Sequence, residues 1–131
     1  MSKNLLVACA LAACALPAAA QVVVIGHPSA PALTISQVQD AYLGKNKSYT
    51  LIDLPEASPV KGDFYRKATG RELAQVKSIW SRIVFSGAGQ PPKELQDAAA
   101  VKKAVAADPK VIGYIERSAL DGSVKTLLTV E

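Results

Sequence analysis

The chain has 131 residues, of which 15 are lysine or arginine and 11 are aspartate or glutamate, giving a formal net charge of +4. This length leaves room for one hydrophobic core and excludes two lobes of ordinary size. The positive surplus suits an anionic ligand, but the basic residues are scattered and lack the interleaved aromatic side chains of a single-strand binder. We therefore expect no nucleic-acid partner.

Residues 1–20 have the layout of a cleavable secretory signal. Lys3 precedes an apolar stretch at residues 5–16, which is followed by Pro17 and three alanines. The stretch is shorter than the about 20 residues of a spanning helix, and we expect no transmembrane segment in the mature chain. We predict a signal peptide at residues 1–20 and a single periplasmic domain at residues 21–131.

A lipoprotein signal is the alternative, because residues 11–14 read Leu-Ala-Ala-Cys. Cys14 would then be lipidated, although the signal would be unusually short. In the favoured interpretation Cys9 and Cys14 both leave with the signal, and the mature chain has no thiol and no disulfide. With one histidine remaining, a conventional zinc site would have to rely on carboxylates, and we predict neither a metal nor a cofactor.

The mature chain begins with a predicted strand, a helix and a second strand. Residues 22–26 are a short apolar run rich in β-branched side chains, which is typical of a buried strand. After a loop, Thr34 and Gln37 have the spacing of a capping box, and the helix that they open ends at Gly44. Residues 49–54 then predict the second strand.

Two helices are predicted in the middle of the chain. Ser58 is placed as the N-cap of the first, with a proline at the first helical position and Gly70 at its end. Residues 73–84 have the best helical periodicity in the chain, and their apolar side, which includes Trp80, predicts a core helix. The glycines and prolines of residues 86–92 indicate an irregular loop.

The last third supplies one helix and two strands. Asp97 is a plausible N-cap of an alanine-rich helix ending at residue 108, and residues 110–116 and 124–130 predict strands. Strands interleaved with helices in this order indicate a small α/β domain on a mixed or parallel sheet of about four strands flanked by helices. Ligands in such folds sit at the carboxyl ends of the strands, so the loop after the second strand is the first place to expect a site.

Four segments together resemble the type II periplasmic binding proteins that capture phosphate for ABC transporters. Residues 33–45 are similar to the LT..QL.DIFLGK helix of that family, and residues 108–115 are similar to its PGAIGYV strand. Residues 54–64 and 80–92 fall at further matching places. The resemblance implies the fold of one lobe of such a protein, standing alone, and a role in binding a solute without catalysis.

The phosphate loop of that family carries an arginine, an aspartate and a Gly-Ser-Gly-Thr helix start. Only the serine is retained here, as Ser58. The other matching positions hold Leu54, Glu56, Ala57, Pro59 and Val60. A proline has no backbone donor and a valine has no hydroxyl, so these changes favour an alternative in which the lobe has lost its ligand.

The start of the helix at Ser58 is the candidate anion site. The amides of Val60 and Lys61 and the positive end of the helix suit an oxyanion, and Arg66 is a further candidate contact. The alternative is that Ser58 is only a cap and Lys61 only a solvated surface charge.

The loop after the first strand holds two more candidate ligand contacts, His27 and Ser29. A catalytic triad would also need a positioned acid, and no spacing in the sequence indicates one. The carboxylates of Asp53, Glu56 and Asp63 could face one cleft, but they could equally belong to a strand end, a turn and a helix surface. We therefore expect no enzyme.

The sequence thus predicts an exported, non-enzymatic solute-binding protein for phosphate or a related oxyanion, associated with ABC-type transport. The alternative is a ligand-free adaptor, derived from a binding-protein lobe, that docks on an envelope transporter, sensor or porin. The expected partners are a small inorganic anion and an envelope transporter or sensor protein.

Overall fold

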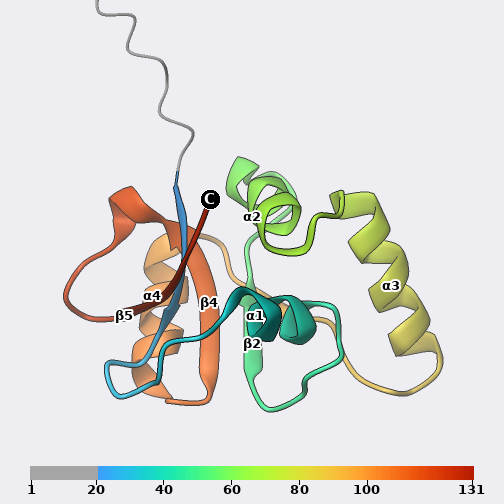
Figure 1. The fold of residues 1–131 in the computed structure, drawn as a ribbon, viewed down its shortest axis with the longest axis horizontal. Helices are drawn as coiled ribbons and strands as arrows, with labels where there is room; N and C mark the ends of the chain where they lie inside the picture. The colour runs from blue at the N-terminus through green and yellow to red at the C-terminus, as the bar shows by residue number, and fades with distance from the viewer. Residues whose placement is uncertain (1–20) are drawn as a thin grey trace, which may run out of the picture.

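The computed structural model describes residues 21–131, so the predicted signal peptide and its two cysteines lie outside the described residues. Strands and helices are interleaved along the chain, with α2 and α3 in succession (Figure 1). Their bounds are β1 Val22–Gly26, α1 Ile35–Tyr42, β2 Thr50–Asp53, α2 Pro59–Thr69, α3 Leu73–Phe85, β3 Lys93–Glu94, α4 Ala98–Ala107, β4 Val111–Glu116, a 3₁₀ turn (η1) Arg117–Ala119 and β5 Lys125–Val130.

The described strands form one sheet in the order β3-β2-β4-β1-β5. β2 is parallel to β3 and β4, whereas β1 is antiparallel to β4 and β5. The predicted fold class, a small α/β domain on a mixed sheet, is therefore confirmed. The sheet has five strands where about four were predicted, because β3 is only two exposed, charged residues long and leaves no hydrophobic pattern to read.

The directions of the strands separate the two loops that the sequence marked for a site. β1 is antiparallel to β4, and β4 is parallel to β2, so β1 and β2 end at opposite ends of the sheet. His27 and Ser29 follow β1, whereas Ser58 follows β2. Figure 1 shows the same separation: the chain leaves β1 at the bottom of the view and enters α2 near the top.

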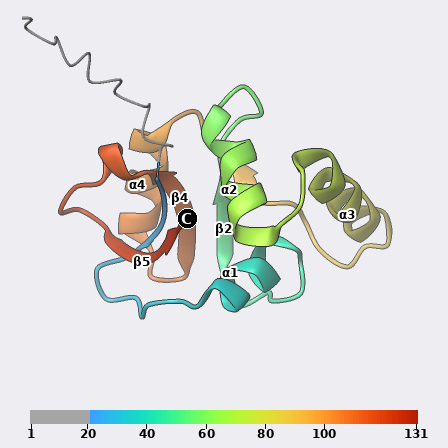
Figure 2. The same ribbon diagram turned by 45° about the horizontal axis from the view of Figure 1, so that its top comes forward.

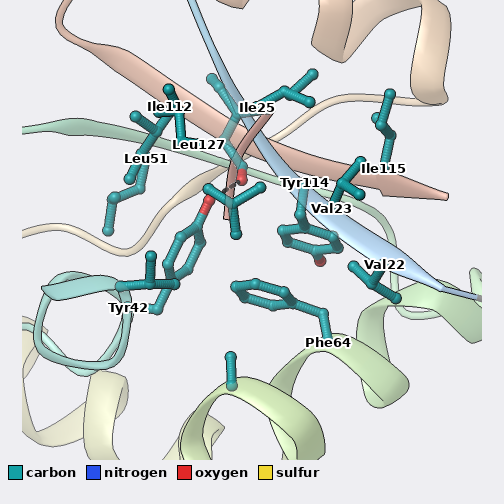
Figure 3. Close-up of a cluster of buried hydrophobic side chains, with 14 of the residues drawn as sticks. Val22, Val23, Ile25, Tyr42, Leu51, Phe64, Ile112, Tyr114, Ile115 and Leu127 are labelled. Atoms are coloured by element: carbon teal, nitrogen blue, oxygen red, sulfur yellow. Dashed lines mark hydrogen bonds between the residues drawn. The ribbon is translucent and has the colours of Figure 1, made fainter. Parts of the chain in front are cut away.

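The core lies between the sheet and helices on both of its faces. Phe64 of α2 stacks on Tyr114 of β4, with ring centroids 3.9 Å apart, and Tyr42 of α1 meets Phe64 edge-on (Figure 3). The adjacent residue Gly113 faces α4, where a Cβ would lie 2.6 Å from a methyl carbon of Val101. Since neighbouring residues of a strand point to opposite faces, α1 and α2 cover one face and α4 covers the other.

Helix α3 is not the core helix that the sequence predicts. Val76 is its only fully covered apolar side chain, while Val84 is 47% exposed and Phe85 is 95% exposed. Figures 1 and 2 both place α3 at the side of the molecule, beyond α1 and β2. The prediction was wrong because a helical period identifies an apolar face but not the surface that covers it.

Helix starts differ in how they are capped. Thr34 and Gln37 form the predicted capping box of α1, in which the Gln37 amide donates to the Thr34 hydroxyl at 3.2 Å and Thr34 N donates to Gln37 Oε1 at 2.8 Å. Ser58 occupies the N-cap position of α2, as predicted, but its side chain makes no capping hydrogen bond.

From residue 21 onward, no helix is long and apolar enough to cross a bilayer.

Candidate functional site

A pocket of about 240 Å³ lies where the parallel strands β2, β3 and β4 end. The chain enters α2 and α4 at the same end of the sheet, so the N-termini of both helices border it. We call it the strand-end pocket. Its walls are Leu54, Ser58, Val60, Gln96, Asp97, Ala98, Glu116 and Ala119.

The first turn of α2 leaves two donors without a partner in residues 21–131. Pro59 has no N–H, and the Lys61 amide already donates to the Ser58 carbonyl at 3.2 Å. The Val60 amide and the Ser58 hydroxyl have no hydrogen bond inside this part of the chain. Both belong to residues of the pocket wall, at the end of the helix where an anion is favoured.

Two carboxylates oppose that preference. Asp97 caps α4, with its Oδ1 accepting from the Ala100 amide at 2.9 Å, and Glu116 accepts from the Ser118 hydroxyl at 3.3 Å. Among the residues that the structure describes, neither a lysine nor an arginine lines the strand-end pocket. The pocket therefore combines favourable donors with negative charge, which weakens any hold on an anion.

Lys61 turns away from the strand-end pocket. Its side chain is 7% exposed, and its Nζ lies 2.8 Å from Glu94 Oε1 and 3.6 Å from Asp53 Oδ2. The interpretation of Lys61 as a solvated surface charge is thus wrong, since a buried carboxylate at the end of β2 draws the ammonium inward. Its side chain lines a second hollow of about 520 Å³, against Tyr65 and α3.

The partner of Lys61, Asp53, is the centre of a buried polar network. Asp53 Oδ2 accepts from the Tyr65 hydroxyl at 2.6 Å, and Oδ1 accepts from the Tyr114 hydroxyl and from the Leu54 amide. Burial raises the pKa of the Asp53 carboxyl above its usual value, although the tyrosine hydrogen bonds and Lys61 reduce the rise. Every buried side-chain polar atom within the described residues has a partner, so the network supports the fold and leaves no group open.

Sequence reasoning placed Asp53 in one group with Glu56 and Asp63; in the structure Asp53 and Glu56 line the same hollow of about 520 Å³, and Asp63 lies outside it. Glu56 pairs with Lys77 on α3, and Asp63 pairs with a neighbour on α2. The tyrosines that hold Asp53 come from distant parts of the chain, and no local signal identifies them. The only sequence signal for this network is an aspartate at the end of a predicted buried strand.

The remaining predicted site residues lie elsewhere. Arg66 is half exposed and pairs with Asp63 and, at 3.8 Å, with Glu72. His27 Nδ1 lies 2.7 Å from the Ser29 hydroxyl in a local turn at the other end of the sheet. Of the predicted contacts, only Ser58 and Val60 line the strand-end pocket. In the part of the chain that the structure describes, no group of three His, Cys, Asp or Glu side chains is placed to hold a metal.

Comparisons with known proteins find similarity at the level of structure. No family model matches the sequence, and no curated protein matches it in sequence. An ABC-type phosphate transport receptor from Vibrio cholerae superposes with a TM-score of 0.64 at 15% identity, covering 82% of this chain and 45% of the receptor.

A second similar structure is a phosphate ABC transporter substrate-binding protein from Clostridium perfringens, described with bound phosphate. It superposes with a TM-score of 0.65 at 19% identity, covering 82% of this chain and 44% of that protein. The chain thus spans less than half the length of either protein. Its fold is that of a single lobe of a phosphate ABC transporter binding protein, as the resemblance in its sequence implied.

Proposed function

We propose that the chain is an exported, non-enzymatic solute-binding protein for phosphate or a related oxyanion, associated with ABC-type transport. The observation that carries the proposal is the start of α2: the Ser58 hydroxyl and the Val60 amide, both without a partner in residues 21–131, border a pocket of about 240 Å³. The fold is shared with a protein described with bound phosphate, which supports the same class of ligand. Residues 1–20 would direct the domain to the periplasm.

The proposed contacts are few, so the affinity should be low. The Ser58 hydroxyl and the Val60 amide donate to the anion, and the N-terminus of α2 adds a partial positive charge. Asp97 and Glu116 repel it. With so few contacts in this domain, we expect a dissociation constant on the order of millimolar unless a partner covers the pocket.

The test is calorimetric titration of the purified protein with phosphate, sulfate and acetate. Ser58→Asp keeps a residue type that is favoured at the N-cap position but places a carboxylate where the anion would sit, so it should abolish the heat of phosphate binding. Glu116→Gln should strengthen binding several-fold. Asp40→Asn, on the exposed side of α1, removes the same charge at a distance and should change little. Unchanged binding in Ser58→Asp would remove the site from α2.

The second candidate function is the ligand-free adaptor. The observation that favours it is the outer face of α3, where Phe85 is 95% exposed and Val84 is 47% exposed beside the hollow of about 520 Å³. An apolar face of this kind is typical of a surface that a protein partner covers. The adaptor becomes the better function if millimolar phosphate, sulfate and acetate all give neither heat nor a shift in the melting temperature of the folded protein.

A further inference from the structure

A cavity of about 380 Å³ lies between α1, the start of β2, α3 and the loop at residues 86–92. Among the residues that line it, two are lysines, Lys47 and Lys93, and none is acidic. We call it the lysine cavity. It differs in this respect from the strand-end pocket and from the hollow at Asp53, which each hold two or more carboxylates.

The donors of the lysine cavity are largely unused. The ammonium of Lys93 and the hydroxyls of Tyr49 and Thr50 have no hydrogen bond or ion pair within residues 21–131. Lys47 donates to the Ala88 carbonyl, which ties the loop at residues 86–92 to the cavity wall while the charge stays beside it. Unpaired donors around a positively charged cavity are the arrangement that receives an anion.

Apart from Asn46 and Gln90, the rest of the wall is apolar. Leu51, Trp80 and Ile83 contribute to it, and Trp80 is held in place by a hydrogen bond of 2.8 Å from its Nε1 to the Tyr42 carbonyl. The volume falls in the range of about 300–1,000 Å³ that is usual for sites of small organic ligands. A bare inorganic anion would leave most of this apolar wall uncovered.

We infer that the lysine cavity binds a small organic carboxylate whose apolar body packs against Trp80 while its carboxylate meets Lys93. Thr50 and Lys93 are the first residues of the parallel strands β2 and β3. The cavity therefore lies at the opposite end of the sheet from the strand-end pocket. The two sites are separate, and loss of one leaves the other intact.

Trp80 is the single tryptophan of the chain and reports directly on the cavity. Its fluorescence is measured while benzoate, benzyl alcohol or phosphate is added to the purified protein. We expect a saturable change with benzoate in the millimolar range or below, weakened by added salt, and little change with benzyl alcohol or phosphate. Lys93→Gln removes the unpaired charge from an exposed strand residue and should weaken benzoate binding about tenfold.

The matched control is Lys77→Gln. Trp80 also lines the hollow that contains Lys77, so this variant removes a lysine close to the same tryptophan but outside the lysine cavity. It should leave benzoate affinity unchanged, as should Ser58→Asp. The inference is overturned if benzoate gives no saturable change, if benzyl alcohol or phosphate binds as well as benzoate, or if Lys93→Gln and Lys77→Gln have equal effects.

Discussion

Asp53 shows how a single buried charge organises its surroundings. It is 4% exposed, and its carboxylate is held by the hydroxyls of Tyr65 and Tyr114 and faced by Lys61. Burial, followed by the charge of Asp53, raises the pKa of both tyrosines, so their hydroxyls stay protonated and donate. The aspartate thereby fixes β4, α2 and the end of β2 around one group.

The pH dependence of stability should reflect the raised pKa of Asp53. An unfolded aspartate has a pKa of about 3.9, and the folded pKa is raised, so the folded state binds more protons between the two values. The stability of the wild type relative to Asp53→Asn should therefore fall as the pH rises from about 4 through the folded pKa. Urea unfolding at a series of pH values measures this difference.

Asp121 provides a control of opposite sign. Hydrogen bonds from Lys102 and Ser123 hold its pKa well below the usual range, so its contribution is present above the unfolded pKa and is lost in acid. The stability of the wild type relative to Asp121→Asn should rise with pH up to about 4 and then stay level. If the Asp53 series rises with pH in the same way, burial does not govern that carboxyl.

The residue-scale predictions from sequence succeeded only where the neighbours are local. The backbone of Ser58 and Val60 can be placed at a helix start because Pro59 and the strand before it mark that start. The direction of the Lys61 side chain depends on its ion pairs with Asp53 and Glu94, which the sheet brings close to it. Contacts of this kind leave no periodic signal in the sequence.

At the scale of the element, the N-cap side chains of α1 and α2 should contribute differently to the free energy of unfolding. Thr34→Ala removes the hydroxyl that accepts from the Gln37 amide and should lower the free energy of unfolding by about 1 kcal/mol. Ser58→Ala removes a side chain that makes no capping bond and should cost a few tenths of a kcal/mol at most. Equal losses in urea unfolding would contradict the capping difference.

Helices α2 and α3 should also respond differently to the loss of a phenylalanine. Phe64 is fully buried against Tyr114, so Phe64→Ala should cost about 3–5 kcal/mol. Phe85 is 95% exposed, and Phe85→Ala should change stability by less than about 0.5 kcal/mol. A large loss from Phe85→Ala in thermal or urea unfolding would show that α3 packs inward.

Most elements could be predicted because their signals are local. The capping box of α1, the apolar run of β1 and the alanine-rich α4 are all found near their predicted places. β3 was missed because two charged residues gain their strand character only from pairing with Ile52 and Asp53. The exposure of α3 was missed because its uncovered face has the same composition as a covered one.

At the scale of the whole molecule, the chain has the fold of a receptor lobe without the length of the receptor. The superpositions cover 45% and 44% of the two phosphate proteins, so this domain matches less than half of each. The resemblance in sequence predicted this fold from an ordered set of four segments. It could not predict the charge of the pocket, because Asp97 and Glu116 belong to segments that only the sheet brings together.

The central claim is that the first turn of α2 receives an anion, and the amide of Val60 tests it most directly. Phosphate is added to ¹⁵N-labelled protein up to about ten times the expected millimolar dissociation constant while the backbone amide resonances are followed by NMR. The account predicts a saturable shift of the Val60 resonance, together with those of neighbouring residues of the strand-end pocket, and its loss in Ser58→Asp. A stationary Val60 resonance, or shifts confined to the opposite end of the sheet, would contradict it.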